Sequence, residues 1–86
     1  MTADKARAAV CSCVAAILKE ERLKRKLSLS ALAVRAGLSY QIISYVERRM
    51  RTPNLDTLLR ISDALGVDAD DVLRRARRRA AKLTAG

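Results

Sequence analysis

The sequence predicts an all-α fold, a compact bundle of five helices that forms a single domain over residues 1–86. Half of the residues are hydrophobic, yet only 2% are aromatic, and the chain has three Gly and one Pro. This composition favours packed aliphatic helices over a β-sandwich or a disordered tail. Capping residues and glycines also recur between apolar segments with helical spacing. A chain this short has room for one hydrophobic core.

The first helix is expected to begin at Thr2 or Asp4, either of which can cap it, and to end near Arg25. Residues 8–18 are uncharged and follow two basic residues, so the core of a signal peptide is an alternative for this segment. Its apolar residues have the spacing of a helix face, which favours a core helix. No apolar run approaches the ~18 residues of a membrane span.

Two short helices are expected next, separated by a tight turn. Ser28 can cap a helix over residues 29–36, and Gly37 can adopt the left-handed conformation that ends it. Ser39 can cap a third helix that begins at Tyr40 and ends at residue 48 or 49. Its period places Ile43 and Val46 inside, and it leaves outside Tyr40, Gln41, Ser44, Tyr45 and Arg48.

The fourth helix is expected over residues 55–65, after a break at Pro53 and before a stop at Gly66. Its apolar bulk comes from Leu55, Leu58, Leu59 and Ile61. The fifth helix is expected to begin at Asp68 and to end near Ala81. Its first turn is acidic and its later turns are basic, as the helix dipole favours.

The residue types argue against an enzyme and against a metal site. The chain has no His, and its two cysteines, Cys11 and Cys13, lack further ligands for a four-coordinate zinc site. Residues i and i+2 of a helix point in different directions, so these thiols are not expected to form a disulfide with each other. We expect them to stay reduced in the cytoplasm, the alternative being a disulfide or metal shared between two chains. No cofactor is expected.

The charge favours a polyanionic partner. Eighteen Lys and Arg against nine Asp and Glu give a net charge of +9 and a pI near 10.6. The basic C-terminal segment, residues 74–86, has six positive charges and no acidic residue, so it should attract phosphate. Alternatively, it is a solvated helix end that raises nonspecific affinity alone.

Three runs carry a resemblance to a known family: LSLSALAVRAGLS at 27–39, ISYVER at 43–48 and PNLDTLLRI at 53–61. Together they resemble the helix-turn-helix of phage repressor and Cro-like regulators, the XRE family, over about Leu18 to Leu73. The resemblance implies a lambda-repressor-like DNA-binding domain whose helix-turn-helix spans residues 28–49. Residues 1–16 then extend the first helix, and their apolar face should pack within the chain, the alternative being contact with a second chain.

The resemblance implies that the third helix reads base edges in the major groove. The residues at the family's base-contacting positions are Tyr40, Gln41, Ser44 and Tyr45. Gln41 can donate to and accept from adenine at once, and each tyrosine ring can contact a thymine methyl group. The alternative for both tyrosines is packing at the rim of the core. Ile42 either touches a thymine methyl or packs against the second helix.

Phosphate contacts in such domains come from helix N-termini and surrounding cations, an alternative for the cations being a plain solvated face. The candidates are Ser28, Arg35, Ser39, Arg48, Arg49 and Arg51. The family pattern also implies a structural ion pair between Arg22 and Glu47.

Three residues depart from the family pattern. Lys26 and Arg49 stand where the family usually ends two helices with Gly, so the loop from Arg49 to Asn54 can differ from the family's. Leu29 stands where the family commonly has a Gln that holds a phosphate, so that contact must be absent or supplied by another residue.

The expected function is transcriptional regulation through double-stranded DNA, most simply as a repressor that binds an inverted-repeat operator as a homodimer. One alternative is an antitoxin-type module that binds a protein partner and regulates its own operon. A controller protein of a restriction-modification operon and a nonspecific nucleic-acid coat protein are the others. No membrane partner is expected.

Overall fold

The computed structural model describes residues 2–84, which form five helices and no strand. The helices are α1 (Ala3–Lys24), α2 (Leu29–Ala36), α3 (Tyr40–Glu47), α4 (Leu55–Leu65) and α5 (Ala69–Thr84). This confirms the predicted all-α, five-helix fold. α2 and α4 have the predicted bounds, whereas α5 continues past Ala81 to Thr84. The added residues are exposed, and the hydroxyl group of Thr84 donates to the carbonyl of Ala80 at 2.9 Å in the last turn of the helix.

Side-chain caps start four of the helices where the sequence places a small polar residue. Their oxygens accept hydrogen bonds from the backbone N–H three residues later, at distances of 2.8 to 3.2 Å. Each cap therefore satisfies one of the N–H groups that a helix start leaves free. The capping residues are Thr2, Ser28, Ser39 and Asn54.

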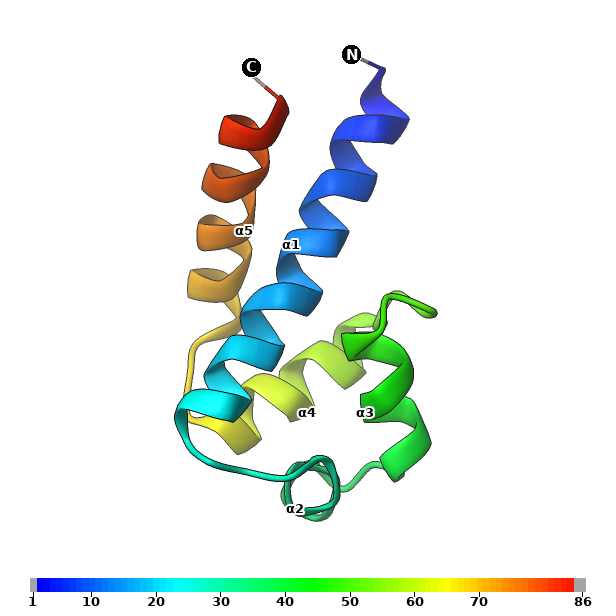
Figure 1. Cartoon of the computed structure of the whole chain (residues 1–86), viewed down its shortest axis with the longest axis vertical. Coiled ribbons are helices and arrows are strands. Elements are labelled where there is room, and N and C mark those ends of the chain that lie inside the picture. Colours follow the sequence, from blue (N-terminus) through cyan, green and yellow to red (C-terminus); the bar gives the residue numbers. More distant parts are fainter. Residues whose placement is uncertain (1, 85–86) are drawn as a thin grey trace.

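α1 and α5 lie side by side and antiparallel, with the start of α1 and the end of α5 at one end of the molecule (Figure 1). α2, α3 and α4 gather at the other end, and α3 and α5 lie on opposite sides of α1 (Figure 1). The molecule is elongated, with extents of 38 × 21 × 18 Å. The two long helices thus form a stem, and the three shorter helices form its head.

One aliphatic core joins the stem to the head. The large side chains that are less than 2% exposed come from every helix: Ile17, Leu18, Leu32, Ile43, Ile61 and Val72. In the stem, Cys13 and Val14 of α1 are buried together with Ala76 and Ala80 of α5. The small alanine side chains allow the two helix backbones to approach closely. The part of α1 from Ala9 onward therefore packs within the chain, whereas residues 3–8 are exposed.

The expected contribution of Leu55 and Leu59 to the core is wrong. Leu55 is 68% exposed and Leu59 is 42% exposed, whereas Leu58, Ile61 and Leu65 are buried. The buried residues are spaced by three and four, so they share one stripe of the helix. Leu55 and Leu59 are four residues apart on an adjacent stripe, which faces solvent.

Four helix ends close in the same way, although only two of them have glycine. Lys26 and Arg49 adopt φ values of 56° and 62°, close to the 68° and 73° of Gly37 and Gly66. In each case the next residue donates its N–H to the carbonyl five residues earlier, at 2.8 to 3.1 Å. This bond is the signature of the Schellman motif. The two cations thus end their helices in the conformation that glycine usually supplies.

Candidate nucleic-acid interface

The turn between α2 and α3 depends on Gly37. Its φ of +68° lies in the left-handed region, and a Cβ placed there would lie 3.2 Å from Nη1 of Arg60. Backbone conformation and space therefore both favour glycine. Ser39 follows, and its hydroxyl accepts the N–H of Ile42 at 3.2 Å. The turn fixes where α3 begins.

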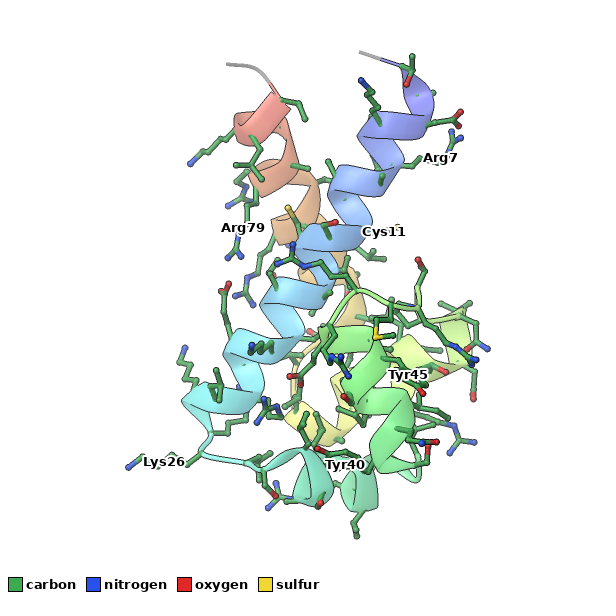
Figure 2. The ribbon with its side chains drawn as sticks, turned by 45° about the vertical axis from the view of Figure 1, so that its right-hand side comes forward. Arg7, Cys11, Lys26, Tyr40, Tyr45 and Arg79 are labelled. Carbon is green, nitrogen blue, oxygen red and sulfur yellow. The ribbon has the colours of Figure 1, made fainter. Side chains whose placement is uncertain are left out.

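One face of α3 packs on the core, and the opposite face is open to solvent. Ile43 and Val46 are 0% and 2% exposed, which anchors the helix. Tyr40 is 53% exposed, and Gln41 is exposed beside it. In Figure 2 Tyr40 lies at the end of α3 that faces away from the stem. A helix of eight residues is about 12 Å long, close to the width of a DNA major groove.

The other outward residues of α3 are less open than Tyr40. Ser44, Tyr45 and Ile42 are half-buried. The guanidinium carbon of Arg51 lies 5.4 Å from the centre of the Tyr45 ring, within the range of a cation–π contact. Arg51 thus lies over a ring that the sequence predicts to contact bases.

Ile42 lies beside the start of α4. It lines, with Val46 and residues 51–54 and 57, a depression of about 210 Å³ between α3 and the α3–α4 loop. Thr52 and Thr57 also line this depression, and the sequence pattern marks neither of them as a functional residue. The only signal for them is their place near Pro53 and Asn54, where the helical pattern breaks.

Exposed cations surround α3 without acidic partners among residues 2–84. Arg35 extends from α2, and three more arginines follow α3 directly. All four are exposed and none is within 4.0 Å of a described carboxylate: Arg35, Arg48, Arg49 and Arg51. Ser28 and Ser39 are also exposed at the starts of α2 and α3. Exposed cations and helix N-termini of this kind suit a polyanion that runs past α3.

A buried ion pair fixes the end of α3. Nε and Nη2 of Arg22 donate to the two oxygens of Glu47 at 2.7 and 2.9 Å. Both side chains are less than 10% exposed. Nη1 of Arg22 donates to the carbonyl of Leu27 at 2.7 Å, so one guanidinium connects α1, the α1–α2 turn and α3. The hydrogen bonds to Glu47 hold the pKa of Arg22 above its usual value.

The remaining candidate chemistry is sparse in the part of the chain that the structure describes. Cys11 is exposed and Cys13 is buried, and both are free thiols. Within residues 2–84, no group of three potential metal ligands comes together. No described helix combines the length and apolar character needed to cross a membrane.

Comparison with known proteins gives one match. A family model described as helix-turn-helix matches residues 18–72, which is more than half of the chain. The match runs from the C-terminal part of α1, which begins at Leu18, through α4 and into the start of α5. No curated protein and no solved structure matches the chain.

Proposed function

Because this chain belongs to the helix-turn-helix family and is an XRE-type DNA-binding transcriptional regulator, we propose that it represses transcription as a homodimer bound to an inverted-repeat operator. The observation that carries the proposal is the presentation of α3. Its first turn exposes Tyr40 and Gln41, while Ile43 and Val46 anchor it in the core. Four arginines that have no acidic partner among residues 2–84 flank this helix.

In this proposal, Gln41 hydrogen-bonds a base edge, and its amide suits the paired donor and acceptor of adenine. Tyr40, Ser44 and Tyr45 contact neighbouring bases through hydroxyl groups or ring edges. The phosphate backbone is held by Ser28, Arg35, Ser39, Arg48, Arg49 and Arg51. The exposure of the arginines and their lack of described acidic partners support this role.

The homodimer follows from the size of α3. Eight residues reach only a few base pairs, and specificity over genomic competitor sites needs more contacts than that. Two copies double the recognised sequence and place half-sites about 34 Å apart, one turn of B-DNA. A bound dimer then occludes polymerase, which gives repression in the cytoplasm.

Selection of bound sequences from a random duplex pool tests the proposal. The expected result is an inverted repeat whose half-sites are about one helical turn apart. Light scattering of the protein on the selected duplex should give two chains per duplex. A single unpaired motif bound by one chain contradicts the homodimer, and a pool without enrichment contradicts sequence-specific binding.

The role of Gln41 is tested by Gln41→Ala. This variant should bind the selected duplex more weakly by about 1–3 kcal/mol and bind scrambled duplex as before, because only a base-edge contact is lost. Fluorescence anisotropy with both duplexes measures the two affinities.

Arg48→Gln is the matched control for that measurement. Its loss should be similar on both duplexes, with a salt dependence lower by about one ion, because phosphate contacts are independent of sequence. Equal losses on both duplexes for Gln41→Ala would remove Gln41 from base reading.

A further inference from the structure

α5 carries a dense row of cations that the reading of DNA by α3 does not use. Six positive side chains lie within nine residues, and we call them the basic ridge: Arg74, Arg75, Arg77, Arg78, Arg79 and Lys82. The opposite face of the same helix is apolar and buried, at Val72, Ala76 and Ala80. The charge is therefore confined to the outer side of α5.

Ion pairs within the protein neutralise only part of the ridge. Arg79 donates twice to Glu20, at 2.7 and 3.0 Å, and Arg75 reaches Glu21 at 3.4 Å. Arg74 pairs with the acidic first turn of α5. The other three cations have no described carboxylate within 4.0 Å: Arg77, Arg78 and Lys82.

Two of these unpaired cations share a surface depression with the paired ones. Arg78 and Lys82 line it together with Arg75 and Arg79, and its volume is about 230 Å³. Four cationic side chains thus converge on one place along α5. Arginine binds phosphate through two parallel N–H donors, so such a place suits a phosphate group.

The ridge faces away from the DNA that α3 would bind. α3 and α5 lie on opposite sides of α1, and the C-terminal part of α5 lies in the stem, far from the head (Figure 1). Figure 2 shows Arg79 on the stem and Tyr40 at the far end of the head. A duplex in contact with α3 therefore leaves the ridge open to a second partner.

The composition of the ridge restricts that partner. Residues 74–84 contain no Asn, Gln or aromatic side chain, so apart from Arg and Lys, which also bind phosphate, they lack the groups that read bases. A second copy of the protein would present like charge. A membrane is disfavoured because the apolar face of α5 is buried in the stem and cannot insert between lipids. A phosphate backbone needs no base-reading group, carries the opposite charge and needs no apolar insertion, so it fits the ridge.

We propose that the basic ridge of α5 binds the phosphate backbone of a second DNA duplex, without reading its sequence. A molecule whose α3 occupies its recognition sequence then holds two duplexes, one on each side of α1. The proposal rests on the DNA-binding function of α3 for the first duplex alone. Binding by the ridge itself depends only on charge and is strongest at low salt.

A capture experiment tests this proposal. A short duplex with the selected sequence is immobilised and saturated with protein, and capture of a fluorescent scrambled duplex is then measured. The variant Arg78→Gln/Lys82→Gln removes two cations of the depression. It should bind the first duplex as the wild type does, but capture the second on the order of tenfold less well, with a salt exponent lower by about two.

The matched control is Lys5→Gln/Lys19→Gln, which removes two exposed and unpaired cations of α1, again within the described residues. Its net charge equals that of the ridge variant, so any difference in capture of the second duplex depends on where the removed cations lie. Equal capture by the two variants overturns the proposal, as does wild-type capture by the ridge variant. Preferential capture of polyglutamate instead of DNA also overturns it.

Failure of the proposed function gives a different result. In that case selection enriches no sequence, and the first duplex is replaced by an immobilised copy of the protein. The copy is the variant Cys11→Ser/Gln41→Cys, attached at exposed position 41, because native Cys11 is itself an exposed thiol. The scrambled duplex is then offered to the ridge directly. Capture that depends on Arg78 and Lys82 supports the ridge, and its absence overturns it.

Discussion

Two cations in the left-handed region show how single residues shape this protein. Lys26 and Arg49 end α1 and α3 with positive φ values, which cost an L-residue about 1–2 kcal/mol. A positive charge next to the negative end of a helix dipole offsets part of that cost. Arg49 is also placed beside α3, where a cation can serve DNA binding. Lys26 does not lie beside α3, so a substitution there tests the backbone strain without changing the proposed DNA-binding surface.

Lys26→Gly should therefore stabilise the protein by up to about 1 kcal/mol, because relief of the φ strain exceeds the lost charge effect and the entropy of glycine. Lys19→Gly is the control: Lys19 is also exposed but lies inside α1, where glycine costs about 1 kcal/mol. Thermal or urea unfolding compares the two variants. Destabilisation of the same size at both positions would mean that Lys26 is not strained.

At this scale, the sequence predicts the outward side chains of α3 well. The helical period alone separates Ile43 and Val46 from Tyr40 and Gln41. It does not predict the cover of Tyr45 by Arg51, because that contact depends on the path of the α3–α4 loop. The helical period predicts on which face of α3 a residue lies. It does not predict which side chain of a loop will contact that residue, because that contact depends on the tertiary structure.

Among the elements, a fork of hydrogen bonds adds to the core contacts of Ile43 and Val46 in fixing the orientation of α3. Arg22 and Glu47 are 25 residues apart in sequence, and their bidentate contact joins α1 to the end of α3. A second fork, between Arg79 and Glu20, has nearly the same distances but joins α5 to α1 at the surface. The two pairs share chemistry and differ in burial, with exposures of 9% and 6% against 38% and 53%.

Glu47→Gln should destabilise the protein by about 3–5 kcal/mol, because it leaves the buried charge of Arg22 without a counter-ion. Glu20→Gln should cost no more than about 1 kcal/mol, since water solvates the freed Arg79. Urea unfolding of both variants makes the comparison. Similar small losses would mean that the Arg22–Glu47 pair is solvated more than its exposure indicates.

The elements themselves were predictable to different degrees. α2 and α4 have the expected bounds because a capping residue and a glycine lie at their ends. The exposure of Leu55 and Leu59 was not predictable, since four leucines leave two possible buried stripes. The Arg22–Glu47 pair was expected from the family resemblance, because sequence spacing alone does not bring residues of different helices together.

Across the whole molecule, two neighbouring carboxylates of α1, Glu20 and Glu21, form ion pairs with α5 along the stem. Hydrogen bonding to Arg79 lowers the pKa of Glu20 below its usual 4.5. Burial raises the pKa of Glu21, but Arg25 and Arg75 lower it by more, so it also lies below 4.5. Carboxylates with a lowered pKa stabilise the folded state above their unfolded pKa, and this stabilisation is lost as the pH falls through the folded pKa.

The free energy of unfolding should therefore be flat near neutral pH and should fall below about pH 4.5. Glu20→Gln/Glu21→Gln removes both groups, so its unfolding free energy should be lower at pH 7 and should decline less in acid. Urea unfolding across the pH range measures both curves. Parallel curves would contradict a role for these two carboxylates in acid stability.

The pairing of α1 with α5 also has a consequence for the synthesis of the protein. Val14 and other apolar residues of α1 leave the ribosome before Ala76 and Ala80 of α5, which complete the same core cluster. The nascent chain therefore exposes an apolar stripe on α1 until α5 has followed it. A chain that stops before α5 keeps this stripe exposed, which favours its proteolysis.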